Sequence, residues 1–142
     1  MRKRTLSREY ALKILYQAEI TRREIKTVSE LFWSDVDNID KTVQQFADRL
    51  VIGAYEHIKV IDDKIAQYAT NWQIKRMAVI DRNVLRMGVF ELLFAPDIPP
   101  KVTINEAVDL AKKYGDMESS KFVNGILDKI HKSEVIPRED QS

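Results

Sequence analysis

Residues 74–115 read IKRMAVIDRNVLRMGVFELLFAPDIPPKVTINEAVDLAKKYG, and this stretch decides the fold. Apolar residues recur at helical spacing from 74 to 94, and the prolines of segment 95–100 end that helix, because proline cannot continue it. A second helical pattern follows, opened by the capping box Thr103-Ile-Asn-Glu106 and closed by Gly115 as a C′ glycine. The stretch therefore predicts two long helices joined by a proline-containing turn.

The same periodicity extends in both directions from this stretch. Four helical segments precede it, the third opened by a cap at Asp40, and one follows at about 119–132. No segment alternates with a period of two, so no strand is predicted. We predict an all-α fold of about seven helices in one domain, residues 1–132. It comprises an N-terminal subdomain of about 1–70, a C-terminal subdomain of about 71–132 and a flexible tail, 133–142.

Composition excludes several classes of protein. The 142 residues are 44% hydrophobic and 32% charged, which is ordinary for a globular chain. There is no cysteine, so disulfide frameworks and thiol catalysis are excluded. No apolar run is long enough to span a membrane and no signal peptide is recognisable, so we expect a cytoplasmic protein without membrane contact.

Catalysis has little support in the sequence. His57 and His131 are the only histidines, and neither has a partner at metal-ligand spacing. The adjacent acids Asp62 and Asp63 point in different directions on a helix and cannot act as a pair alone. No phosphate-binding loop or nucleophile motif occurs. We predict that the protein is not an enzyme and has no catalytic residue, metal or cofactor.

Charge is distributed unevenly along the chain. Residues 1–23 carry seven Lys or Arg against two acids, whereas residues 24–63 carry nine acids against four bases. A basic terminus of this kind is either a solvated end or a binding segment for a polyanion, and charge alone leaves both open. Four phosphate contacts to a single strand would give a slope of log K against log salt of about −3. The cations that precede or begin the first helix are Arg2, Lys3, Arg4 and Arg8.

Phosphate contacts do not read sequence, which requires bases stacked on aromatic rings and bonded at their edges. Lys121 and Phe122 open the last predicted helix and could supply such contacts, although periodicity slightly favours a place for Phe122 in the core. Tyr16 is ambiguous in the same way. Gly125 lies inside the helix, where glycine is unfavourable, and implies the close approach of another helix or of a partner backbone.

The residues of four segments resemble the NusB family of bacterial transcription antitermination factors. Ile98-Pro-Pro-Lys-Val-Thr-Ile-Asn-Glu-Ala-Val-Asp-Leu-Ala-Lys-Lys-Tyr-Gly115 and Ser120-Lys-Phe-Val-Asn-Gly-Ile-Leu-Asp-Lys129 are similar to its C-terminal signature. Arg8-Glu-Tyr-Ala-Leu-Lys-Ile-Leu-Tyr-Gln17 and Asn83-Val-Leu-Arg-Met-Gly-Val-Phe-Glu-Leu92 are similar to its first and central helices, in the same order. The resemblance covers residues 1 to about 132.

This resemblance implies an all-helical fold of two subdomains and a role in RNA binding. The family binds the boxA element of nascent RNA together with the ribosomal protein NusE, and joins NusA, NusG and RNA polymerase in reading through terminators, chiefly in ribosomal RNA operons. A homodimer is compatible with the family, as is a monomer. By position, the resemblance assigns RNA contacts to Arg2, Lys3, Arg4, Arg8, Tyr16, Glu118, Lys121 and Phe122, and NusE contacts to Asp81 and Arg86. Glu118 stands where some relatives have Asp, which keeps the charge but changes the side-chain length.

Two other functions are open from the sequence. The same helical module occurs as the RNA-binding region of some ribosomal RNA cytosine methyltransferases, which continue into a catalytic domain with a cysteine nucleophile. This chain ends at Ser142 and has no cysteine, so it would be a stand-alone RNA-binding module. The other alternative is a protein–protein adaptor that uses the acidic segment 24–63. Binding of labelled RNA distinguishes an adaptor from both other functions.

Overall fold

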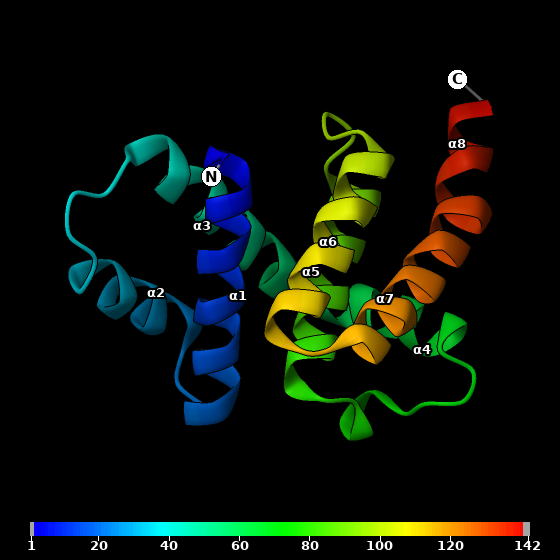
Figure 1. The fold of residues 1–142 in the computed structure, drawn as a ribbon, viewed down its shortest axis with the longest axis horizontal. Coiled ribbons are helices and arrows are strands. Elements are labelled where there is room, and N and C mark those ends of the chain that lie inside the picture. The colour runs from blue at the N-terminus through cyan, green and yellow to red at the C-terminus, as the bar shows by residue number, and fades with distance from the viewer. Residues whose placement is uncertain (1, 141–142) are drawn as a thin grey trace. The chain divides into compact units, whose positions relative to one another are not determined.

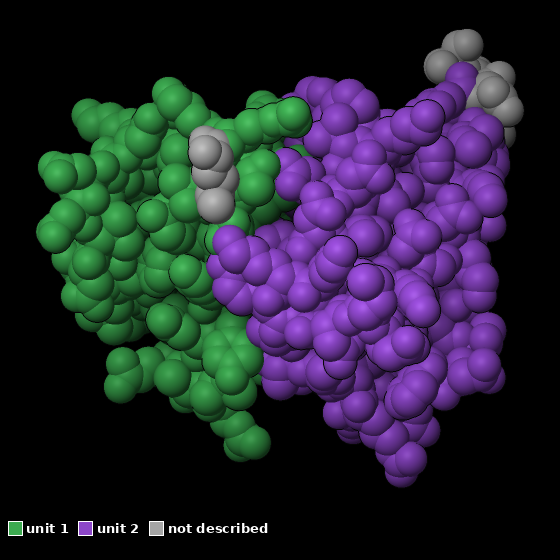
Figure 2. All heavy atoms as spheres, in the orientation of Figure 1, with its two compact units in different colours: residues 1–56 green, residues 57–142 purple. Residues whose placement is uncertain are grey.

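The computed structural model describes residues 2–140, and every regular element in that range is helical, as predicted. The chain forms two compact units, residues 1–56 and 57–142 (Figure 2). We predicted a boundary near residue 70, but the helix at 58–68 packs against later helices and so belongs to the second unit. None of the helices in the described range is long and apolar enough to cross a membrane.

The first unit contains three helices, with α1 packed against both others (Figure 1). Asp40 caps the third helix as predicted, because its Oδ1 accepts a hydrogen bond of 2.8 Å from the backbone N–H of Thr42. The hydroxyl of Thr42 and the ammonium of Lys3 also bond this carboxylate and hold the pKa of Asp40 well below its usual range. The helices are α1 (Lys3–Thr21), α2 (Ile25–Ser34) and α3 (Lys41–Glu56).

The second unit is built around α5, a helix in which every residue from Asn83 to Leu92 is buried except the half-buried Arg86. It packs against α4, α6 and α7, so its side chains contribute to contacts with three neighbours. Two features confirm the predicted pattern: the long helix ends before the prolines, and the next one ends at Gly115. The elements are α4 (Ile58–Tyr68), η1 (Ile74–Arg76), α5 (Val79–Phe94), α6 (Pro100–Tyr114), α7 (Met117–Ile130), the π-helical turn η2 (His131–Val135) and α8 (Ile136–Asp140).

The start of α6 differs from the predicted capping box. The helix begins at Pro100, with Pro99 as the N-cap, because the fixed φ of proline suits the first helical position. Thr103 therefore lies inside the helix, where its buried hydroxyl donates a hydrogen bond of 2.7 Å to Oε1 of buried Glu91 on α5. The Thr-x-x-Glu pattern at this position reflects a contact between helices instead of a cap.

Of the predicted flexible tail, 133–142, residues 133–140 continue the helical path through η2 and α8. Glu134 attaches this segment to α4, because its carboxylate accepts a hydrogen bond from the Tyr68 hydroxyl and pairs with the Lys64 ammonium, each at 2.7 Å. The Lys64 ammonium, followed by the Tyr68 hydroxyl, lowers the pKa of Glu134, and the carboxylate in turn raises the pKa of Tyr68. Gln141 and Ser142, the end of the predicted tail, lie outside the described residues.

Two glycines in helices have opposite surroundings. Gly88 of α5 is closely covered by α7, since a Cβ added there would lie 2.8 Å from Cδ1 of the fully buried Leu127. Gly125 of α7 is exposed, and a Cβ added there would meet no atom within 4 Å. The other helix that we expected to approach Gly125 is therefore absent from the part of the chain that the structure describes.

Glu134→Gln is expected to loosen residues 131–140. Because the pKa of Glu134 is lowered in the folded state, its contacts stabilise the segment above the ordinary glutamate pKa of about 4.3. That contribution is lost as pH falls through the lower folded-state pKa. Amide hydrogen exchange at pH 7 should be faster in residues 131–140 of the variant than in the parent, and the difference should shrink as the pH is lowered through the folded-state pKa. Asp63→Asn on α4 is the charge-matched control, and equal exchange in all three proteins at pH 7 would contradict the role of Glu134.

Alanine at the two glycines is expected to change the free energy of unfolding in opposite directions. Gly125→Ala should add about 0.8–1 kcal/mol, the difference in helix propensity, because the methyl group meets nothing. Gly88→Ala should lower stability, since overpacking against Leu127 costs about 1–3 kcal/mol. Urea denaturation followed by circular dichroism measures both. A Gly125→Ala protein less stable than the parent would mean that this position packs within the chain.

Candidate nucleic-acid interface

Three exposed cations mark the beginning of α1: Arg2, Lys3 and Arg4, here called the α1 cations. They are held by the helix and do not form a loose arm, because α1 begins at Lys3 and Arg2 is its N-cap. The guanidinium of Arg4 lies 4.4 Å from the centroid of the Phe46 ring, a cation–π distance. Lys3 pairs with Asp40 at 3.1 Å. Both side chains therefore have defined positions on the surface of the first unit.

Arg8 differs from the other three cations in its exposure. We expected it to be free to follow a phosphate backbone, but only 2% of its surface is exposed. Its guanidinium lies 5.2 Å from the centroid of the same Phe46 ring, because residues four apart on a helix share a face. Arg8 thus supports the packing of α1 on α3, and three of the four predicted cations are available on the surface.

A groove between α1 and α3 adjoins the α1 cations, with a volume of about 420 Å³. No carboxylate lines it, so its charge is positive and suits an anion. Tyr16, the other predicted residue on α1, is 40% exposed and does not line this groove. The lining residues are Lys3, Arg4, Ser7, Thr42, Gln45, Phe46 and Arg49.

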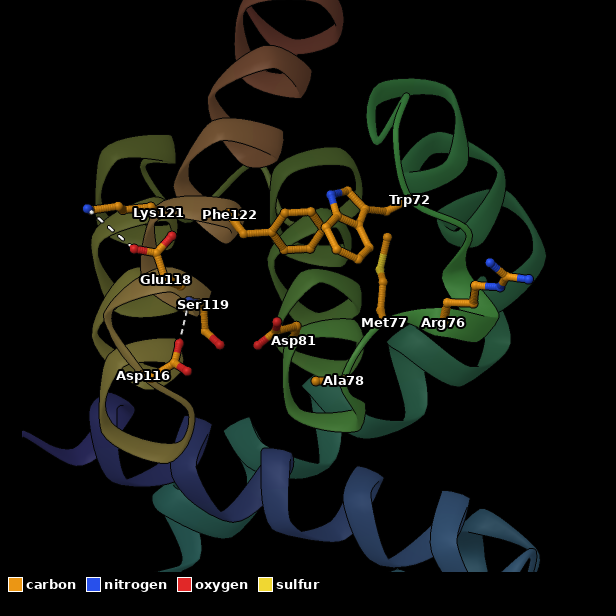
Figure 3. Close-up of a pocket in the computed structure, with 10 residues that line it drawn as sticks. All are labelled: Trp72, Arg76, Met77, Ala78, Asp81, Asp116, Glu118, Ser119, Lys121 and Phe122. Carbon is orange, nitrogen blue, oxygen red and sulfur yellow. Dashed lines mark hydrogen bonds and ion pairs between the residues drawn. The ribbon is translucent and has the colours of Figure 1, made fainter.

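Trp72 and Phe122 form an aromatic pair on the second unit (Figure 3). Their ring centroids are 6.0 Å apart and the rings are inclined at 75°, an edge-to-face arrangement. Trp72 is 56% exposed, whereas Phe122 is half-buried. Phe122 is thus neither a core residue nor a fully exposed one: it supports a tryptophan whose indole is open to solvent and could stack on a base.

The aromatic pair lies beside a groove of about 590 Å³, here called the acidic groove, which extends between α5 and the start of α7 (Figure 3). Asp81 is notable there, because its Oδ1 is buried and has no hydrogen-bond partner among the described residues. A buried acceptor without a hydrogen bond lowers the stability of the protein unless a donor from a ligand or partner reaches it. The groove is lined by Trp72, Arg76, Met77, Ala78, Asp81, Asp116, Glu118, Ser119, Lys121 and Phe122.

The other carboxylates of this groove have different roles. Asp116 caps α7, since its Oδ1 accepts a hydrogen bond of 2.7 Å from the backbone N–H of Ser119, which also lowers the pKa of Asp116. Glu118 lies one turn before Lys121 and pairs with it at 3.6 Å, with both side chains mostly exposed. Ion pairs of this exposure contribute little, so both groups can turn to a ligand.

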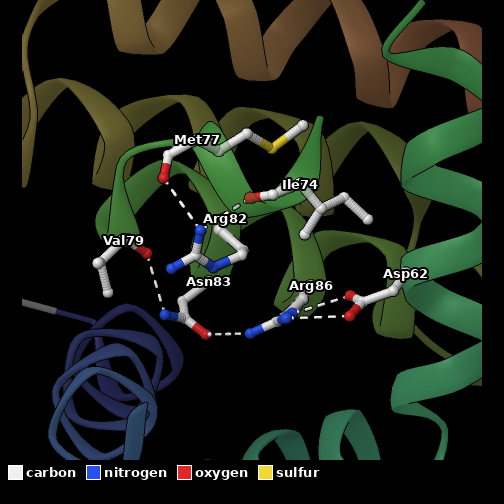
Figure 4. A network of polar contacts seen from close by, with 7 residues as sticks. All are labelled: Asp62, Ile74, Met77, Val79, Arg82, Asn83 and Arg86. Atoms are coloured by element: carbon white, nitrogen blue, oxygen red, sulfur yellow. Dashed lines mark hydrogen bonds and ion pairs between the residues drawn. The ribbon is translucent and has the colours of Figure 1, made fainter. Parts of the chain in front are cut away.

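Two arginines of α5 attach neighbouring segments of the second unit to that helix (Figure 4). Arg82 donates to the carbonyl oxygens of Ile74 and Met77 at 2.8 and 3.0 Å, and so fixes η1 against α5. Arg86, a predicted NusE contact, makes two hydrogen bonds of 2.9 Å to Asp62 on α4. Its guanidinium therefore serves the packing of α4 on α5 in this structure.

Two of the residues considered for catalysis, His57 and Asp62, are engaged in structural contacts. His57 stacks on Phe94, with ring centroids 4.0 Å apart. Asp62 is paired with Arg86, as described above. Residues 2–140 contain no group of three or more potential metal ligands.

Trp72 is the residue of this surface that sequence reasoning did not select. The available signal was its position directly after the Thr70-Asn71 break, where a large aromatic side chain has no helical face to pack into. In the turn at this point, the backbone N–H of Trp72 donates a hydrogen bond of 3.1 Å to the carbonyl oxygen of Ala69.

The fold and these surfaces define an all-helical protein of two units that presents cations and an aromatic pair with an exposed tryptophan. The chain matches the NusB family over residues 5–132 and belongs to that family. It is 43% identical to the transcription antitermination protein NusB of Syntrophus aciditrophicus, with 100% of this chain and 92% of that protein covered. A NusB from an Anaeromyxobacter species is 46% identical, with 90% and 89% covered.

Solved structures agree with this assignment. A structure of T. maritima NusB superposes with a TM-score of 0.87 at 38% identity, covering 100% of this chain and 99% of that one. A structure of the antitermination factors NusB and NusE in complex with double-stranded RNA superposes with a TM-score of 0.86 at 33% identity, covering 94% and 98%. The relatives are thus of nearly the same length as this chain and share its fold throughout.

Proposed function

We propose that this protein is a noncatalytic antitermination factor that binds boxA RNA together with NusE in the cytoplasm. In this proposal it joins NusA, NusG and RNA polymerase and promotes transcription through ribosomal RNA operons. The observation that carries the proposal is a relative of the same fold in complex with NusE and RNA. The exposed α1 cations and aromatic pair of this chain are the groups that such a role requires.

The two kinds of surface supply different parts of RNA binding. Arg2, Lys3 and Arg4 attract phosphates of any sequence, because a phosphate contact carries no base information. The aromatic pair can stack on an unpaired base, and the carboxylates beside it can accept hydrogen bonds from base amino groups. Affinity would then come mainly from α1, and the preference for boxA from the acidic groove, with Glu118 and Lys121 at its rim.

Asp81 is the stronger of the two predicted NusE contacts. Its buried Oδ1 has no partner in the described chain, so a donor from NusE would satisfy a group that is costly to leave unpaired. Arg86 is already paired with Asp62, and a contact with NusE would have to use its remaining donor capacity. Tyr16, with 40% of its surface exposed, stays a predicted RNA contact.

Replacing Arg2, Lys3 and Arg4 together by Gln is expected to weaken binding to boxA and scrambled RNA by the same factor. Each phosphate contact to a single strand contributes about 0.7 to the salt slope, so the slope should fall by about 2. Fluorescence anisotropy of labelled RNA, titrated from 50 to 200 mM salt with NusE present, measures both quantities. Arg8→Gln is the contrasting variant. Because Arg8 is buried, this substitution should lower the stability of the fold and not the salt slope of RNA binding. A larger loss for boxA than for scrambled RNA would contradict this role.

Phe122→Ala is expected to reduce the preference for boxA over scrambled RNA while keeping the salt slope. Removing the ring withdraws the support of Trp72, and a stacking contact is worth about 1–3 kcal/mol per base. Competition binding with the two RNAs gives the preference directly. Phe32→Ala, an aromatic deletion on the first unit, is the control for general loss of packing. Unchanged discrimination by a folded Phe122→Ala protein would rule out the stacking role.

A further inference from the structure

We propose that a second groove, along the exposed face of α7, carries the phosphate backbone of the bound RNA over Gly125 and between Lys121 and Lys129. This inference rests on the proposed function and adds residues that the sequence comparison did not assign. The groove, here called the α7 groove, has a volume of about 230 Å³ and lies within the second unit. It shares Trp72, Lys121 and Phe122 with the acidic groove, so the aromatic pair borders both.

Gly125 is the first observation. Glycine within a helix is less favourable than alanine, and a helix that only had to fold would gain from a side chain here. At Gly88 the neighbouring Leu127 explains the missing side chain, whereas at Gly125 no described atom beyond the two chain neighbours and the helix's own nearby backbone comes within 4 Å of the added Cβ. The free space lies on the lining of a groove. A ligand backbone that approaches α7 closely accounts for a glycine that the fold does not need.

Charge identifies the ligand as a polyanion. Lys121 and Lys129 stand four residues before and four after Gly125, about 12 Å apart along the helix axis. Both line the α7 groove, and no carboxylate does, in contrast to the three carboxylates of the acidic groove. Lys129 is exposed and has no ion-pair partner within residues 2–140. The other polar lining includes Asn71 and Tyr68, whose neutral side chains do not offset this charge.

These observations favour RNA over a protein segment. A polypeptide could also approach a glycine, but two lysines in a groove that no carboxylate lines suit successive phosphates. The aromatic pair would then lie between the phosphate backbone and the bases of one RNA strand. The phosphates would lie in the α7 groove and the bases would point toward the acidic groove. This arrangement places negative phosphates away from Asp81 and Asp116, which would repel them. Glu118, which pairs with Lys121 at 3.6 Å across a mostly exposed ion pair, would turn away when a phosphate takes its place.

The test compares substitutions in the α7 groove with matched substitutions beside it. Gly125→Ala and Gly125→Leu add side chains that the free helix tolerates, and Asn124→Ala and Asn124→Leu place the same side chains on the adjacent exposed position. Lys129→Gln removes a groove cation, and Lys132→Gln removes one that pairs with Asp128 outside it. Each purified full-length protein is titrated with labelled boxA and scrambled RNA, with and without NusE, and its thermal unfolding is recorded.

The expected result is that binding and stability change independently. Gly125→Leu should lower the affinity for both RNAs about tenfold, which is the scale of the cost of an overfilled contact. Gly125→Ala should also bind RNA more weakly than the parent, although it should unfold at a higher temperature. Lys129→Gln should lower the salt slope by about 0.7, whereas Lys132→Gln and the Asn124 variants should stay near the parent.

Three outcomes would overturn the inference. The first is that the parent protein binds RNA and the Gly125→Leu and Lys129→Gln variants bind it with the same affinity. The proposed function then stands, and the α7 groove is not part of it. If Gly125→Leu loses NusE but keeps RNA, the occupant is a polypeptide. If the parent binds neither RNA under any of these conditions, the proposed function fails and this inference fails with it.

Discussion

The close approach of α7 to α5 at Gly88 is the contact on which the second unit depends. Leu127 occupies the space that a side chain at 88 would fill, so the two helices are nearer than ordinary side chains would allow. This contact fixes how far along α5 the helix α7 lies. It therefore also fixes the position of Phe122, which lies five residues before Leu127 on α7. Trp72 can then meet that ring at 6.0 Å, because Arg82 holds the following loop against α5. A packing contact in the core thus sets the geometry of an exposed pair.

The distribution of carboxylates gives two neighbouring surfaces different chemistry. Asp81, Asp116 and Glu118 all line one side of the aromatic pair, and Asp116 is required there as the cap of α7. The other side has lysines and neutral residues only. Since an aromatic ring accepts any base, the charges beside it decide which part of a nucleotide each groove favours. In the first unit, Phe46 has a comparable ordering role, because it positions Arg4 on the surface and Arg8 beneath it.

The sequence was sufficient for features that local chemistry controls. Helical periodicity predicted the all-α class, and the prolines and Gly115 predicted where two helices end. Features that depend on a distant partner were missed. Arg8 was indistinguishable from Arg4 until α3 placed Phe46 over both. Thr103 resembled a cap because its actual partner, Glu91, lies on another helix. The tail looked flexible because the contact of Glu134 with Tyr68 joins residues 66 positions apart.

Gly88 and Gly125 show most clearly what sequence alone cannot separate. Both are glycines inside amphipathic helices, each at the same cost in helix propensity. The structure accounts for the first through Leu127 and leaves the second without any neighbour in the described chain. A sequence shaped only by the stability of the isolated fold would carry alanine at the second position. Its glycine is therefore better explained by a bound state, in which stability is given up for the approach of a ligand.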